Sequence, residues 1–301
     1  MKQIPYLHTG SKVAIAAPAR MVTREEMQFA IDWLKEKGFT PIYDEKLFAK
    51  YHIFAGDDDF RASVFQQYLD DETIEAIWLA RGGYGSIRII DKLDFTKFLQ
   101  HPKWIVGFSD GTVLHGKLNR LGVPSLHAAM PFYFENKTQE AKLALFNALM
   151  GNTLCYEFPS QSLNRLGVME GEIVGGNLSV LYSMMGSNTF PNLNEKILFI
   201  EEVDEYIYHI DRMMHALKRA GKLSNLNGLI VGGLTQIHDN SHPFGMTVEQ
   251  VITEAVAEYN YPVCFGFPAG HFDDNRALFF GKETRIKVTE EASFFLSNFV
   301  H

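Results

Sequence analysis

The arrangement in this sequence with the clearest chemical potential is a serine set between two glycines. The segment Gly107-Phe108-Ser109-Asp110-Gly111 follows an apolar run that predicts a strand and precedes a pattern that predicts a helix. Glycine on either side allows a sharp turn that lifts the serine hydroxyl above the edge of a sheet, where it can act as a nucleophile. The Asp110 amide, at the start of the helix, can then stabilise a developing oxyanion. The alternative interpretation is a Ser-Asp helix cap, because both residues favour such positions.

A second glycine-rich segment, Arg81-Gly82-Gly83-Tyr84-Gly85, also follows a predicted strand. Its backbone amides can face an anion, either a phosphate or a tetrahedral oxyanion. The segment matches neither the dinucleotide-binding fingerprint nor the P-loop, and a tight turn between a strand and a helix explains it equally well. If Ser109 is a nucleophile, we expect Gly83 to supply the second oxyanion donor.

A nucleophilic serine needs a histidine to remove its proton and an acid to orient that histidine. Among eleven histidines, His271 stands apart because it lies just beyond a predicted strand at 263–267, where the chain ends of a parallel sheet gather. Glu201 and Glu202 likewise end a predicted strand, and the residues alone do not choose between them. Because Ser109, the glutamates and His271 all follow strands, we expect them to converge.

The elements that must position these residues alternate short β-branched runs with amphipathic helical patterns, which predicts a parallel sheet covered by helices. Thr23 and Glu26 form a capping box before a helix that Gly38 closes, and Asp57–Asp59 can cap the next helix. In the first half we expect strands at 13–17, 40–43, 74–80 and 104–108, and helices at 112–121 and 139–150.

Periodicity is lost between Gly151 and Gly167, which predicts a domain junction. We therefore predict an N-terminal α/β domain over residues 1–150, a linker at 151–167 and a C-terminal domain at 168–301. The fold class is α/β, with a Rossmann-like parallel sheet followed by a second α/β or β-rich unit. In that unit we expect strands at 171–174, 197–200, 228–232, 263–267 and 284–288, and helices at 178–185, 207–220 and 248–259.

The composition of the chain excludes several classes of partner and cofactor. The 301 residues carry a formal net charge of −8 without a basic stripe, so we expect no nucleic-acid partner. The two cysteines, Cys155 and Cys264, lack the spacing of a zinc site, and we expect neither a metal nor another cofactor. The apolar run at 13–17 is too short for a signal peptide, and no uninterrupted run is long enough to cross a membrane. These features predict a cytoplasmic protein.

The ordered motifs resemble those of the LD-carboxypeptidases, a family of serine peptidases that includes muramoyl-tetrapeptide carboxypeptidases and microcin C immunity peptidases. The resemblance covers nearly the whole chain. It is carried by Val13-Ala14-Ile15-Ala16-Ala17-Pro18, Arg81-Gly82-Gly83-Tyr84-Gly85, Gly107-Phe108-Ser109-Asp110-Gly111-Thr112, Gly175-Gly176-Asn177-Leu178, Phe199-Ile200-Glu201-Glu202-Val203 with Ile210-Asp211-Arg212-Met213, and Gly270-His271.

The resemblance implies that Ser109 is the nucleophile, His271 the base and Glu201, rather than Glu202, the acid. It implies oxyanion donors at the Gly83 and Asp110 amides, no cofactor, and a homodimer of two-domain subunits with the active site in the groove between the domains. The implied reaction cleaves the amide between the L-centre of a diaminoacid and a terminal D-alanine in a cell-wall tetrapeptide. Two departures put specificity in doubt: Leu278-Phe279-Phe280-Gly281 replaces the family's usual Leu-Pro-Leu-Gly, and Glu202 replaces a frequent Asp.

A terminal carboxylate requires a cationic or amide-rich partner in the site. We take Arg81, Arg212 and Asn177 as candidates for this contact. Arg212 has an alternative role, because it can instead form an ion pair with Asp211 or Glu205.

Other functions fit parts of the pattern. An α/β-hydrolase esterase shares the Gly-x-Ser-x-Gly turn and the order Ser, acid, His, although the Arg-Gly-Gly-Tyr-Gly segment argues against it. A peptidase acting on a peptidyl nucleotide, as in microcin immunity, would use the same three residues. A protein that binds a peptide without cleaving it is a third possibility. The last is a metal-dependent hydrolase that uses His238, Asp239, His242, His271, Asp273 and Asp274.

Overall fold

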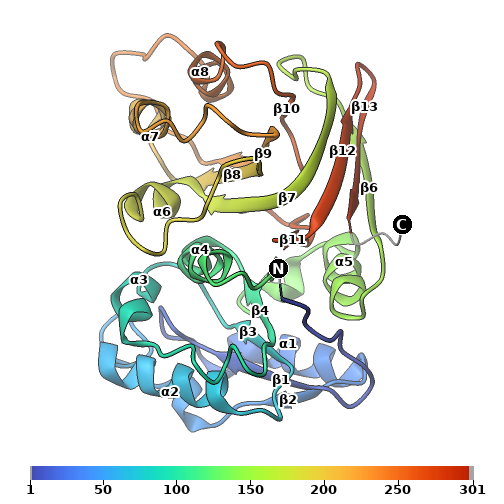
Figure 1. Cartoon of the computed structure of the whole chain (residues 1–301). Helices are drawn as coiled ribbons and strands as arrows, with labels where there is room; N and C mark the ends of the chain where they lie inside the picture. Colours follow the sequence, from blue (N-terminus) through green and yellow to red (C-terminus); the bar gives the residue numbers. More distant parts are fainter. Residues whose placement is uncertain (1, 298–301) are drawn as a thin grey trace.

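Thirteen strands join into one branched sheet in the computed structural model, which describes residues 2–297 (Figure 1). The first half of the chain contributes five parallel strands in the order β5-β4-β3-β1-β2. These strands are β1 (Lys12–Ala16), β2 (Thr40–Ile42), β3 (Ala76–Leu79), β4 (Trp104–Gly107) and β5 (Ser125–His127). The residues of β3 and β4 are all buried, as expected for central strands of a parallel sheet.

The helices of the first half begin where the sequence supplies caps. Thr23 and Glu26 form the predicted capping box of α1 (Arg24–Glu36), and Asp57 caps α2 (Asp58–Asp70). A single turn, α3 (Ser86–Ile89), follows the Arg-Gly-Gly-Tyr-Gly segment. The remaining helices are α4 (Thr112–Arg120) and α5 (Gln139–Leu149).

The second half builds another parallel set, in the order β10-β9-β8-β7. Its strands are β7 (Gly167–Asn177), β8 (Ile197–Val203), β9 (Gly228–Thr235) and β10 (Val263–Cys264). The helices between them are α6 (Leu178–Ser183), α7 (Ile207–Arg219) and α8 (Val248–Ala255), and they lie on one side of this set in Figure 1.

Strand β7 is long because it pairs with two different neighbours. Its first part pairs with β12 (Glu283–Val288) up to Glu172, and its second part pairs with β8 from Ile173 onward. Gly171, with φ of +139°, lies where the strand changes partners, a conformation that glycine adopts easily. Beyond β12, β13 (Ala292–Ser297) and β6 (Leu154–Pro159) extend an antiparallel layer.

A short strand, β11 (Leu278–Phe280), joins the two halves. It pairs antiparallel with β5 and parallel with β7. The parallel strands of the two halves therefore run in opposite directions, so the ends of β4 and β8 do not share one sheet edge. Another contact must bring their ends together.

That contact is made by α4, which packs on β7 and α6. The Asn177 amide, at the end of β7, donates a hydrogen bond of 3.0 Å to the Thr112 hydroxyl at the start of α4. At the other end of α4, the Asn119 side-chain oxygen accepts a bond of 2.9 Å from the Asn192 amide. Helix α4 thus places the start of the Ser109 turn against the end of β7.

The expected fold class is confirmed, with a parallel α/β first half and a mixed second half. Four strands were not predicted, namely β5, β6, β11 and β13. Strand β6 lies inside the segment 151–167 that we expected to be a linker, and the boundaries at 150 and 168 remain a prediction. The predicted strand at 263–267 is only two residues long. No helix among the described residues is long and apolar enough to span a membrane.

Gly116 tests the packing of α4 against the second half. A methyl group at this position would lie 2.3 Å from the Thr189 carbonyl oxygen, too close for any real contact. Alanine favours an isolated helix over glycine by about 1 kcal/mol, yet we expect Gly116→Ala to lower the free energy of unfolding by about 1–3 kcal/mol because of this overlap. Urea unfolding followed by circular dichroism measures the change.

Arg120→Ala, at an exposed position of the same helix, is the matched control and should change stability by no more than about 0.5 kcal/mol. Greater stability of Gly116→Ala than of the wild type would contradict the close packing of α4.

Candidate active site

Ser109 occupies the sharp turn between β4 and α4. Its φ is +60°, an uncommon backbone conformation for a residue with a side chain. Neighbouring glycines make room for this turn: a methyl group at Gly107 would lie 2.7 Å from Leu79 Cδ1, and one at Gly82 would lie 2.9 Å from Ser109 Cβ. The geometry is that of a serine held in a strained strand-to-helix turn, as the Gly-x-Ser-x-Gly pattern predicts.

The structure brings Ser109, His271 and Glu201 into one hydrogen-bonded chain. His271 Nε2 lies 3.0 Å from Ser109 Oγ, and His271 Nδ1 lies 2.6 Å from Glu201 Oε2. Ser109 comes from the first half of the chain, whereas the other two residues come from the second. The Glu201 side chain is fully buried and that of His271 is 21% exposed, so the chain of contacts leads from the interior toward solvent.

Hydrogen-bond partners fix the tautomer of His271. A carboxylate only accepts, so Nδ1 carries the proton that is donated to Glu201, and Nε2 is left to accept from the Ser109 hydroxyl. Burial lowers the pKa of His271, but the charge and hydrogen bond of Glu201 outweigh burial, and the pKa lies above its ordinary value of 6.5. The imidazole is thus prepared to take a proton from Ser109.

The two adjacent glutamates have different surroundings. Glu201 points at His271, and its Oε1 has no hydrogen-bond partner among the described residues. Glu202 accepts bonds from the Asn177 side chain and from the Ser179 and Val203 amides. Burial raises the pKa of Glu202, and these three donors oppose that shift. Only Glu201 is placed to orient the histidine.

Two buried contacts support the loop that carries His271. Gly270 has φ of +132°, and a methyl group there would lie 3.2 Å from Glu201 Oε2, so glycine allows the loop to approach the carboxylate. The Gly270 amide donates a bond of 2.9 Å to the fully buried Asn275 side chain. Lys137 Nζ donates to the carbonyl of Phe272, the residue after His271, at 2.9 Å.

Neither Asn275 nor Lys137 was singled out from the sequence. Lys137 is distant from this loop along the chain, and a buried asparagine has no characteristic spacing relative to the residue that it supports. Their roles become visible only from the contacts.

The two amides expected to face an oxyanion are available. Among residues 2–297, neither the Gly83 nor the Asp110 amide donates a hydrogen bond to a protein group. The Asp110 carboxylate is buried and accepts a bond of 2.8 Å from the Ser86 amide, which ties the Ser109 turn to the Arg-Gly-Gly-Tyr-Gly segment. Burial also raises the pKa of Asp110.

The three residues expected to bind a terminal carboxylate lie in different surroundings. The Arg81 guanidinium stacks on Phe132, with 3.7 Å between its Cζ and the ring centre. The Asn177 side chain is buried, donates to Glu202 and caps α6. Arg212 lies over the Tyr208 ring, in a hollow on α7, and makes no hydrogen bond or ion pair with Ser109, His271 or Glu201.

The residues of the metal-dependent alternative do not gather. His238 pairs with Asp204 at 2.7 Å, Asp239 accepts from the Asn240 and Phe244 amides, and His271 is bound to Glu201. Within the described part of the chain, no group of three or more His, Cys, Asp or Glu side chains is arranged to hold a metal ion.

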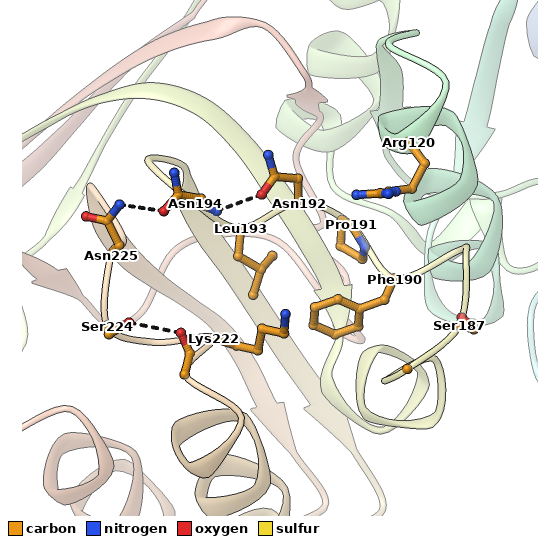
Figure 2. Close-up of a pocket in the computed structure, with 12 residues that line it drawn as sticks. Arg120, Ser187, Phe190, Pro191, Asn192, Leu193, Asn194, Lys222, Ser224 and Asn225 are labelled. Atoms are coloured by element: carbon orange, nitrogen blue, oxygen red, sulfur yellow. Dashed lines mark hydrogen bonds between the residues drawn. The ribbon is translucent and has the colours of Figure 1, made fainter.

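A hollow of about 390 Å³ lies away from the Ser109 site. Figure 2 shows Arg120 and Lys222 directed into it, beside Phe190 and several asparagines. Its other lining segments precede β8 and β9, whereas Glu201 lies near the opposite end of β8. The hollow therefore has no part in the Ser109 chemistry.

Comparison with known proteins shows the family to which the chain is similar. The family model of the LD-carboxypeptidase N-terminal domain matches residues 13–128, and that of the C-terminal domain matches residues 170–286. A Bacillus subtilis protein named "probable murein peptide carboxypeptidase" is 29% identical over 95% of this chain and 92% of its own. The microcin C7 self-immunity protein MccF of Escherichia coli is 26% identical over 85% of this chain and 83% of its own.

Among solved structures, the muramoyltetrapeptide carboxypeptidase from Oxalobacter formigenes matches with a TM-score of 0.87 and 25% identity. The match covers 95% of this chain and 98% of that protein. The similarity thus extends over both halves of the fold.

The raised pKa of His271 depends on the neighbouring carboxylate. We expect Glu201→Gln to lower this pKa, because the amide lacks the negative charge that favours the imidazolium. NMR titration of the histidine ring protons measures the shift. Glu202→Gln is the matched control: it also removes a buried negative charge, but one that makes no hydrogen bond to His271, so its effect should be smaller. Equal shifts in both variants would contradict the pairing of His271 with Glu201.

Proposed function

This chain belongs to the LD-carboxypeptidase family, and we propose that it is a serine peptidase that releases a terminal D-alanine from cell-wall tetrapeptides. The bond cleaved would be the amide between the L-centre of a diaminoacid and the D-alanine. The observation that carries this proposal is the hydrogen-bonded chain from Ser109 through His271 to Glu201.

In the proposed reaction, Ser109 Oγ attacks the carbonyl carbon of the substrate amide while His271 Nε2 takes the hydroxyl proton. Glu201 holds the imidazole in the required tautomer and stabilises the imidazolium that forms. When the tetrahedral intermediate collapses, the C–N bond breaks and His271 returns the proton to the leaving amine, which departs as D-alanine. Water activated by His271 then hydrolyses the acyl-enzyme ester and regenerates Ser109.

Charge on the substrate carbonyl oxygen must be stabilised during both steps. We assign this role to the Gly83 and Asp110 amides, because both lack protein acceptors in the described part of the chain. The bond from Ser86 to the Asp110 carboxylate would hold the two donor segments in a fixed relation, so that little reorganisation is needed in the transition state.

The muropeptide substrate is favoured over a peptidyl nucleotide by the pattern of relatives. The Bacillus subtilis protein, named for murein peptide, matches at higher identity and coverage than the microcin C7 self-immunity protein. The Oxalobacter formigenes structure is likewise that of a muramoyltetrapeptide carboxypeptidase. A homodimer and a cytoplasmic location, where muropeptides would be processed, remain predictions.

Replacing the nucleophile tests the proposal directly. We expect the wild type to release D-alanine from a tetrapeptide with an L,D terminal bond and not from its L,L counterpart. Ser109→Ala should lower kcat by about six orders of magnitude, because the histidine and glutamate cannot act without the hydroxyl. Chromatographic assay of free alanine measures release. Turnover by the variant at the wild-type rate would show that another group attacks the bond.

The dependence of activity on pH follows from the pKa of His271. The base must be neutral to accept the serine proton, so kcat/KM should fall as the pH decreases through the pKa of His271, which lies above 6.5. In Glu201→Gln this acid limb should move to lower pH, and kcat should drop by about 10⁴-fold because the imidazole loses its orientation. Initial rates with the L,D tetrapeptide between pH 5 and 9 measure both effects. If the acid limb does not move in Glu201→Gln, the group whose titration produces this limb is not His271.

A further inference from the structure

A carboxypeptidase must recognise the free carboxylate of the residue that it removes, and this inference rests on the function proposed above. In the substrate, the carboxylate carbon is three bonds from the carbonyl carbon that Ser109 would attack, a separation of at most about 4 Å. The group that binds the carboxylate must therefore lie within one side chain's reach of Ser109 and its oxyanion donors.

Arg212 and Arg81 do not meet the requirement well. Arg212 stacks on Tyr208 in a separate hollow on α7. The Arg81 guanidinium lies on the Phe132 ring, 3.5 Å from the Met21 carbonyl oxygen and 4.0 Å from the Glu26 carboxylate. Its faces and edges are thus largely occupied by the protein.

Arg20 lies against the proposed oxyanion donor Gly83. A methyl group built on Gly83 would be 2.6 Å from Arg20 Cδ and 2.8 Å from Arg20 Nε, so the arginine side chain lies directly against this glycine. A methyl group built on Gly82, one residue earlier, would be 2.9 Å from Ser109 Cβ. Ser109, the two glycines and Arg20 therefore form one continuous series of contacts.

The charge of Arg20 is not neutralised. Arg20 is exposed, and within residues 2–297 its guanidinium makes no ion pair and no hydrogen bond. Burial lowers the pKa of Arg81, and the like charge of Arg20 lowers it further, in keeping with two guanidinium groups near each other. Arg20 is thus an unpaired cation that lies against Gly83, the proposed oxyanion donor.

We propose that Arg20 forms a carboxylate-binding subsite that recognises the terminal carboxylate of the leaving amino acid. A guanidinium can donate two parallel hydrogen bonds to a carboxylate, which fixes its orientation as well as its position. Gly83 then has two roles. Its amide donates to the oxyanion, and because it has no side chain, Arg20 can approach it closely. A peptide extended beyond the terminal residue presents no carboxylate at this place, so the subsite restricts cleavage to the chain end.

Binding to the inactive Ser109→Ala protein tests the subsite independently of turnover. The two probes are the L,D tetrapeptide with a free terminal carboxylate and the same peptide with a terminal carboxamide. Isothermal titration calorimetry should show tighter binding of the carboxylate. Adding Arg20→Gln should weaken binding of the carboxylate about 10- to 100-fold and leave the carboxamide unchanged within about twofold.

Arg120→Gln is the matched control, because Arg120 is also exposed and unpaired among the described residues but lies at the far end of α4. It should leave both affinities unchanged. Arg20→Lys keeps the charge but not the paired donors and should recover part of the lost affinity.

Three outcomes would overturn the proposal. Equal weakening of both probes by Arg20→Gln would indicate a structural role, and weakening of neither would show that Arg20 does not contact the peptide. Failure of the Ser109→Ala protein to bind the carboxylate peptide at all is the third. Failure of the proposed function looks different: the wild type releases no D-alanine, while the preference for the carboxylate persists and still depends on Arg20.

Discussion

One hydrogen bond joins the chemistry of the two halves: His271 Nε2, from the second half, meets Ser109 Oγ, from the first, at 3.0 Å. A displacement of about 1 Å would break this bond, so the halves must be held in a fixed relation. Three contacts supply that relation. Strand β11 pairs with both β5 and β7, the Asn177 amide binds the Thr112 hydroxyl, and Asn192 binds Asn119 at the other end of α4.

The positions of the reactive groups depend on the close approach of backbone segments. Gly82 lies closer to Ser109 than a residue with a side chain would permit, and Gly270 lies against Glu201, where a methyl group would make a tight contact of 3.2 Å. These glycines do not contribute chemistry themselves. They allow the donor segment and the histidine loop to reach the serine and the carboxylate, which explains why the motifs around the reactive residues are rich in glycine.

Much of this arrangement could be predicted from the sequence, because it depends on local patterns. The capping box of α1, the strand before Ser109 and the strand that ends near Glu201 follow from periodicity and cap residues. The short strands β5 and β11 could not be predicted, since three residues show no periodicity, and β11 is the strand that reverses the direction of the second half. The sequence predicts that the ends of these strands meet at one shared sheet edge. In the structure the two sets of parallel strands run in opposite directions, and α4 brings their ends together.

The choice between Glu201 and Glu202 shows why partners, rather than position, decide function. Successive residues of a strand point to opposite faces, so the sequence places one of the two toward His271 without saying which. Glu202 has three donors, and its charge is shared among them. Glu201 is fully buried with one oxygen unpartnered in the described residues, so its charge acts almost entirely on the imidazole. A buried carboxylate with a single partner is costly to stability. At this position the same lack of competing donors is what fixes the orientation of the histidine and holds its pKa above the ordinary value.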